Sequence, residues 1–207
     1  MMKIYIFQVQ PWSSRLKPSP YFADSFRYFF KRFRSREFLL RWFIKKAGPV
    51  TEPFEYPIKV SNLNGVLIIL PERSDDLLSY AELLRSLESQ KIKGLSILSN
   101  KRHEKLLETL KIQSEVLYYT ALGCRYGEPE FRKLEQAVCE RHPSLCLHLE
   151  PKPIFQLLYL AKVSGAAYRL GFDSEKYYPL LNLSLVAGED SLQQAKSLAK
   201  IFNGERA

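Results

Sequence analysis

The sequence lacks the features that mark several large classes of protein. It has three cysteines in 207 residues, an odd and small number that excludes a disulfide framework and indicates a reducing compartment. It has no run of about 18 apolar residues, so we expect no transmembrane helix. The opening MMKIYIFQVQPWSS has no basic region followed by an apolar one, so we expect no signal peptide. These absences predict a cytoplasmic protein.

The common catalytic and metal-binding motifs are also missing. The chain has no Gly-rich dinucleotide or phosphate loop, no nucleophile elbow and no zinc-protease pair. Cys139 and His142 would share a helix face, and Cys146 and His148 a strand face. Cys and His suit zinc, but this spacing fits no known zinc module, and Cys is an ordinary small filler of a central strand. We therefore expect no metal and no cofactor, and we expect His103 to lie on an exposed helix.

Positive charge is present in excess but is confined to the front of the chain. The net charge is +9. Residues 1–60 hold 12 Lys and Arg against 4 Asp and Glu, a balance of +8, whereas residues 61–207 hold 19 against 18. The two parts need separate explanations. We divide the chain into a basic aromatic N-terminal extension (1–60: a short strand, a Pro-rich loop, an amphipathic helix and a linker) and a body (61–207).

The body alternates short apolar runs with amphipathic stretches of about ten residues or more. The apolar runs predict strands at 66–71, 94–100, 115–120, 144–150, 166–172 and 180–188. The amphipathic stretches predict helices at 75–90, 103–111, 129–141, 154–164 and 191–203. Such alternation requires crossover connections. It predicts an α/β fold, a Rossmann-like parallel sheet with helices on both faces, preceded by a basic aromatic helical segment.

The first strand-to-helix loop of the body, LPERSDDLL, contains the best candidate for chemistry. Ligands of an open parallel sheet bind at the carboxyl ends of its strands, where this loop lies. Asp75 or Asp76 could therefore act as a general base. The alternative, which spacing alone favours, is that Ser74, Asp75 or Asp76 caps the following helix and complements its dipole.

Two stretches of the body resemble glycosyltransferase family 9, the heptosyltransferases of lipopolysaccharide core synthesis. LIILPERSDDLLSYAELLRSL (67–87) is similar, without gaps, to that family's first strand, loop and helix, and AKVSGAAYRLGFDSE (161–175) to a later helix, turn and strand. The resemblance covers about 64–203. It implies half of a GT-B fold, the acceptor-type domain, and it places Asp76 on the family's proposed base.

The departures from the family are equally specific. RSD at 73–75 is bulkier than the family's small residues before the aspartate, and HLE at 148–150 replaces its Asp-x-Gln. The donor-binding half expected of a GT-B enzyme does not follow. The resemblance therefore implies a degenerate, non-catalytic relative, a pseudoenzyme without nucleotide-sugar binding. The alternative is a split glycosyltransferase, with Asp76 as base and a separate chain as the donor domain.

The segment SFRYFFKRFRSREFLLRWFIKK (25–46) has eight basic residues and one acid, with aromatics at helical spacing. Its apolar stripe must be buried against a membrane surface, a protein or nucleic acid. Confinement of charge to this segment and the family's lipid-linked acceptors favour anionic lipid at the bacterial inner membrane, with protein packing next and nucleic acid last. The candidate membrane- or partner-binding residues are Phe26, Phe29, Phe30, Arg32, Phe33, Arg34, Arg36, Arg41, Trp42, Phe43, Lys45 and Lys46.

These observations lead to a preferred function and two alternatives. The preferred one is a scaffold, adaptor or regulatory subunit, peripheral at the inner membrane, with a protein or lipid-linked saccharide as partner. The split transferase and a basic nucleic-acid-binding protein are the alternatives. The nucleic-acid-binding alternative predicts that binding to nucleic acid falls steeply as the salt concentration rises.

Overall fold

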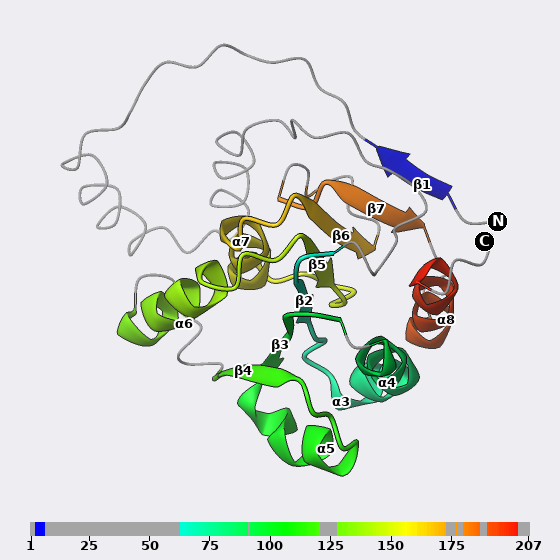
Figure 1. Cartoon of the computed structure of the whole chain (residues 1–207), viewed down its shortest axis with the longest axis horizontal. Coiled ribbons are helices and arrows are strands. Elements are labelled where there is room, and N and C mark those ends of the chain that lie inside the picture. The colour runs from blue at the N-terminus through cyan, green and yellow to red at the C-terminus, as the bar shows by residue number, and fades with distance from the viewer. Residues whose placement is uncertain are drawn as a thin grey trace.

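A computed structural model describes residues 3–6, 63–90, 92–120, 128–172, 177, 180–186 and 190–202. Within these residues seven strands form one sheet in the order β1-β7-β6-β5-β2-β3-β4 (Figure 1). The strands are β1 Lys3–Ile6, β2 Val66–Ile69, β3 Leu95–Asn100, β4 Glu115–Tyr119, β5 Leu145–His148, β6 Tyr168–Phe172 and β7 Leu183–Val186. β2 to β7 run parallel, which confirms the predicted Rossmann-like α/β fold.

The first strand makes the sheet mixed. β1 pairs antiparallel with β7, with Ile4 opposite Leu185. The four residues of β1, which we assigned to the N-terminal extension, therefore belong to the same sheet as the body. The helix predicted before residue 46 lies outside the described residues.

Helices cover both faces of the sheet, as Figure 1 shows. They are α3 Ser74–Ser79, α4 Ala81–Ser89, α5 Glu104–Thr109, α6 Pro129–Cys139, α7 Phe155–Val163 and α8 Ser191–Phe202, with a 3-10 turn, η2, at Lys101–His103. α6 and α7 lie on one face, and α3, α4, α5 and α8 on the other. None of the helices in the described part of the chain is long and apolar enough to cross a bilayer.

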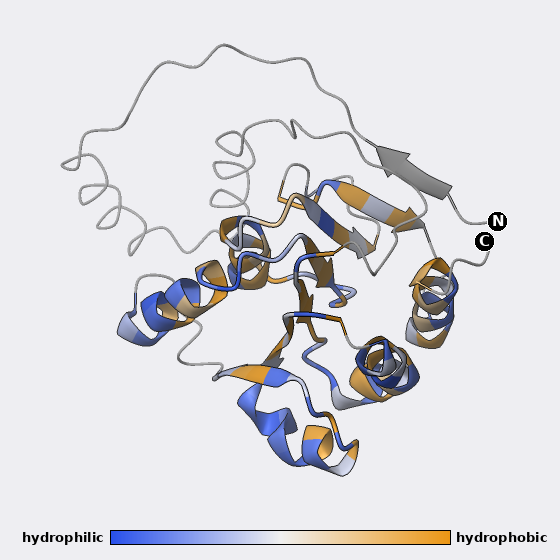
Figure 2. Ribbon diagram, viewed as in Figure 1, coloured by the Kyte–Doolittle hydropathy of each residue, from blue (hydrophilic) through white to orange (hydrophobic). Residues whose placement is uncertain are grey.

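The sheet separates two apolar cores because successive strand residues point to opposite faces. In β2, Val66 and Ile68 join the core beneath α4 and α8, whereas Leu67 and Ile69 join the core beneath α6 and α7. All four are buried. Figure 2 shows the result, with hydrophobic colour concentrated in the central strands. A continuous apolar run is thus the expected sequence of a strand covered on both sides.

The helix predicted at 75–90 is two helices. At Tyr80 the backbone N–H bonds to the carbonyl of Leu77, three residues back, at 3.0 Å, which ends α3 in a 3-10 turn. The Tyr80 side chain is buried, and its hydroxyl donates to Oε1 of Gln194 on α8 at 2.8 Å. The break between α3 and α4 therefore coincides with a tertiary contact to α8. The helical spacing of apolar residues in the sequence does not reveal this break.

The last predicted strand begins three residues later than expected. Asn182, placed inside that strand by its apolar neighbours, instead bonds through its side-chain amide to β6 and to the residue just before it. Its Oδ1 accepts from the N–H of Arg169 at 2.6 Å, and its Nδ2 donates to the carbonyl of Ala167 at 2.7 Å. The side-chain amide therefore fixes the approach to β7, and regular pairing begins at Leu183.

Candidate functional site

The topology singles out the carboxyl ends of β2 and β5. From β2 the chain moves to β3 and β4 on one side, and then to β5, β6 and β7 on the other. Adjacent strands β2 and β5 thus mark the point where the strand order reverses. Open parallel sheets bind ligands in the crevice at this point. The loop from β2 to α3, the turn η2 after β3 and the residues after β5 all lie at this edge of the sheet.

Glu150 occupies the position between the two strand ends. Its Oε2 accepts the backbone N–H of Glu72 at 2.7 Å, and its Oε1 accepts that of Lys152 at 3.2 Å. The residue is only 8% exposed. Burial raises the pKa of the Glu150 carboxyl, the two backbone N–H groups oppose this rise, and the carboxylates of Glu72 and Asp76 add to it. A buried carboxylate therefore lies where sheets of this kind bind their ligands.

The loop after β2 is held from the other side by the turn after β3. The guanidinium of Arg102 donates to the backbone carbonyl of Glu72. Arg102 is itself positioned by Asn100, whose Oδ1 accepts the backbone N–H of Arg102 at 3.1 Å. The backbone of Glu72 is consequently fixed at both ends, its N–H by Glu150 and its carbonyl by Arg102.

His103 lies beside this loop and is buried, with 1% of its surface exposed. The prediction of an exposed helix was wrong, because Lys101–His103 form one 3-10 turn whose third residue points into the protein. Neither ring nitrogen has a hydrogen-bond partner within the described residues. Burial lowers the pKa of His103, as does the charge of Arg102. The backbone carbonyl and the carboxylate of Glu72 oppose this lowering of the pKa. The carbonyl does so without accepting a hydrogen bond from the ring.

Asp76, the predicted base, lies in the first turn of α3 with its side chain 24% exposed. The Nε of Arg73 lies 3.8 Å from its Oδ2. Asp75 is 86% exposed and lies 3.9 Å from the same guanidinium. Arg73 stands at the N-cap position and makes no side-chain cap hydrogen bond. The helix begins at Ser74, so none of Ser74, Asp75 and Asp76 stands at the N-cap position, and the capping part of the interpretation was wrong. Asp75 and Asp76 do lie in the first turn, where their charges complement the helix dipole as expected.

The Cys and His residues considered for zinc are dispersed. α6 ends at Cys139, and His142 follows it with a φ of +44°, so the two do not share a helix face as predicted. The thiol of Cys139 donates to the carbonyl of Val163 at 3.2 Å. Cys146 and His148 are buried on β5. Across the residues that the structure describes, no group of three or more His, Cys, Asp or Glu is placed to hold a metal ion.

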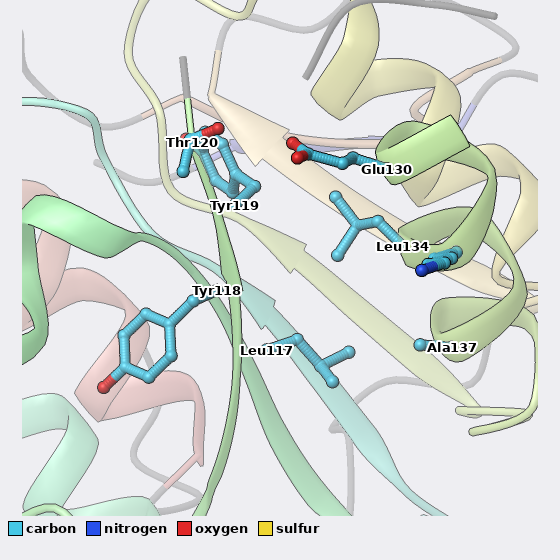
Figure 3. Close-up of a pocket in the computed structure, with 8 residues that line it drawn as sticks. Leu117, Tyr118, Tyr119, Thr120, Glu130, Leu134 and Ala137 are labelled. Atoms are coloured by element: carbon cyan, nitrogen blue, oxygen red, sulfur yellow. The ribbon is translucent and has the colours of Figure 1, made fainter. Parts of the chain in front are cut away.

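A hollow lies at the far edge of the sheet, between β4 and α6. It has a volume of about 390 Å³. Figure 3 shows Leu117 and Leu134 facing each other across it, with Glu130 above and Tyr118 turned to the other side of the strand. Its lining residues are Leu117, Tyr118, Tyr119, Thr120, Glu130, Lys133, Leu134 and Ala137. This hollow is mainly apolar, and Glu150 is not among the residues that line it.

The predicted membrane- or partner-binding residues between Phe26 and Lys46 lie outside the described residues. Of the predicted site, the structure therefore places Asp76 alone. It adds Glu72, Arg102 and Glu150, which sequence reasoning did not select as site residues. The HLE at 148–150 marked a departure from the family, but nothing in the sequence paired Glu150 with Glu72.

Comparison with known proteins gives a single likeness to report. No family model matches the chain, and no curated protein matches it. Among solved structures, the chain is similar to the ADP-heptose lipopolysaccharide heptosyltransferase II of E. coli, with 22% sequence identity and a TM-score of 0.43. The match covers 57% of this chain and 33% of that chain. The chain thus spans about a third of that enzyme's length, and the likeness concerns the fold alone.

Proposed function

We propose that the protein is a non-catalytic, heptosyltransferase-like bacterial protein that serves as a scaffold, adaptor or regulatory subunit at the cytoplasmic face of the inner membrane. The observation that carries the non-catalytic part is the position of Glu150. Its two carboxylate oxygens accept the N–H groups of Glu72 and Lys152 at the reversal point of the sheet. That is where ligands of such folds bind.

The charges around the crevice support the same proposal. A ligand that carries phosphate groups needs donors directed at its phosphate oxygens. Here Glu72 and Asp76 lie near enough to Glu150 to raise its pKa, so a bound phosphate would meet three carboxyl groups. Arg73, an exposed cation of the same loop, lies within 4 Å of both Asp75 and Asp76. The neighbouring carboxyl groups therefore disfavour a phosphate-bearing ligand at this site.

The membrane part of the proposal rests on the segment 25–46. Its eight basic residues and its aromatic stripe match the composition of an interfacial helix, and each Lys or Arg near an anionic surface contributes about 1 kcal/mol. The partner we propose is anionic lipid, together with an envelope protein or a lipid-linked saccharide. Protein packing and nucleic acid are the competing partners of this segment.

Co-sedimentation of the full chain with phosphatidylglycerol vesicles tests the proposal. We expect pelleting with these vesicles and not with neutral phosphatidylcholine ones. A variant with Arg32, Arg34, Arg36 and Arg41 changed to Gln should lose at least tenfold in binding. The matched control changes four exposed basic residues of the body to Gln, and it should bind normally: Lys101, Lys105, Lys111 and Arg132.

Three outcomes would contradict the membrane proposal. If the full chain does not pellet, the aromatic stripe is buried in protein. If excess nucleic acid displaces the chain from vesicles, the nucleic-acid alternative is favoured. If the control variant loses binding as strongly as the Arg variant, total charge rather than the segment determines binding.

One observation favours the split transferase as a second candidate. The side chain of Asp76 keeps partial exposure at the reversal point, as a base that meets a hydroxyl requires. The discriminating pair is D76N and D75N, introduced into the chromosomal gene. Under the scaffold proposal neither substitution reproduces the effect of deleting the gene. If D76N behaves like the deletion and D75N does not, the split transferase is the better description.

A further inference from the structure

We propose that the reversal point of the sheet contains a binding site for a small carboxylate, formed by the backbone N–H groups of Glu72 and Lys152. We call this site the seat, and we propose that the carboxylate of Glu150 occupies it as an internal ligand. The inference rests on the placement of Glu150 used for the proposed function and goes beyond it. It assigns carboxylate ligands to this site. It also makes the Glu150 contact autoinhibitory, because Glu150 blocks the binding of a carboxylate from a ligand or partner.

The seat consists of two backbone N–H groups from the loops that follow two different strands. Glu72 follows β2 and Lys152 follows β5, and their N–H groups lie 2.7 and 3.2 Å from the two oxygens of Glu150. Neither group belongs to a helix. Two N–H donors, one for each oxygen of a carboxylate, give charge-assisted hydrogen bonds, which are about twice as strong as neutral ones.

Arg102 positions one of these donors. Its guanidinium bonds to the carbonyl of Glu72, and so it fixes the orientation of that residue and adds positive charge beside the seat. Hydrogen bonds made in sequence polarise one another. The seat would therefore persist when the side chain of Glu150 is shortened, because Arg102 and the strand pairs hold the loop independently of it.

The surrounding acids limit which anion the seat accepts. The carboxylates of Glu72 and Asp76 raise the pKa of Glu150, and they would oppose a dianion more strongly than a single negative charge. A planar monoanion with two oxygens, such as formate, matches both the donors and the charge. A phosphate dianion does not. A carboxylate brought by a ligand or partner would have to displace Glu150 to bind.

Chemical rescue of the full chain tests the inference. We expect E150A to unfold at a lower temperature than the wild type, because two partly buried N–H groups lose their acceptor. Sodium formate should restore the unfolding temperature of E150A in a saturable way, since binding to the folded state stabilises by mass action. Sodium chloride at equal ionic strength should not. The wild type and E150Q, in which the side chain still fills the seat, should not respond to formate.

The results that overturn the inference are as definite. A formate effect on E150A no larger than that on the wild type shows that no seat exists. A response of E150Q equal to that of E150A shows that formate acts elsewhere. If E150A does not fold in chloride, recovery in formate supports the seat and failure in both salts overturns it. The vesicle experiment does not involve Glu150. A negative vesicle result would therefore contradict the scaffold proposal, whereas a negative formate result would contradict only the carboxylate site.

Discussion

His148 is a residue whose chemistry depends on where the fold places it. It lies near the end of β5, opposite Ile69 of β2 and Gly171 of β6. Its side chain is fully buried, and neither ring nitrogen has a hydrogen-bond partner in the described part of the protein. Burial lowers the pKa of His148 to about 4, with its own backbone carbonyl in partial opposition. The folded protein therefore holds this imidazole neutral at pH values where an exposed one is charged.

This burial predicts a loss of stability in mild acid. The unfolded chain takes up a proton near pH 6.5 and the folded chain only near pH 4, so the free energy of unfolding falls as the pH drops through that window. The contribution of His148 is on the order of 3 kcal/mol. We expect H148L to reduce the difference between the unfolding free energies at pH 7 and pH 4.5, measured by urea denaturation.

The control for this prediction is H142N. His142 is exposed and has a φ of +44°, a conformation that Asn tolerates. This variant should keep the pH dependence of the wild type. If H148L retains the full acid-induced loss, another group is responsible. His103, whose pKa is also lowered by burial, would then be the next residue to change.

At the scale of elements, the contact between the α3–α4 break and α8 joins segments far apart in the sequence. Tyr80 and Gln194 are both buried and are separated by 114 positions. Beside them the Ser79 and Ser191 hydroxyls lie 3.0 Å apart. The last helix is thus fastened to the first helix of the body by hydrogen bonds as well as by apolar packing.

We expect Y80F to lower the free energy of unfolding by about 1–2 kcal/mol, because it removes a buried hydrogen bond and keeps the ring. Chemical denaturation measures this change. Y118F is the matched control, since the side chain of Tyr118 on β4 is only partly buried, and it should cost less. An equal cost for both variants would show that the bond to Gln194 contributes nothing of its own.

At the scale of the whole molecule, stability should be graded from the centre of the sheet to its edges. β2 is paired on both sides, with β3 and β5, and all its side chains are buried. β4 is the last strand of the sheet in the described residues, and three of its five side chains are partly exposed. Edge elements open locally at lower free energy than central ones.

Native-state hydrogen exchange measures this gradation. We expect the amides of Leu67 and Ile68 to exchange only through global unfolding. Amides of β4 that do not pair with β3 should exchange at least tenfold faster. If the amides of β4 were protected from exchange as strongly as those of β2, the β4 edge of the sheet would have to be covered.

Much of the fold follows from local patterns. Continuous apolar runs such as VLII in β2 and LCLH in β5 predict buried strands, because only a strand covered on both faces needs apolar residues at every position. Amphipathic stretches predict the helices between them. Errors occur where a tertiary contact overrides the local pattern, as at Tyr80, at Asn182 and at the turn that ends in His103.

The candidate site is predictable only in part for the same reason. The sequence by itself determined the alternation of strands and helices, and with it the placement of Asp76 at the carboxyl edge of a parallel sheet. Strand order is not encoded locally, because it depends on which buried strands pair. Only the tertiary structure placed β5 beside β2 and so brought Glu150 within 2.7 Å of the N–H of Glu72, 78 positions away. That contact turns an acidic residue after a strand into the group that fills the crevice.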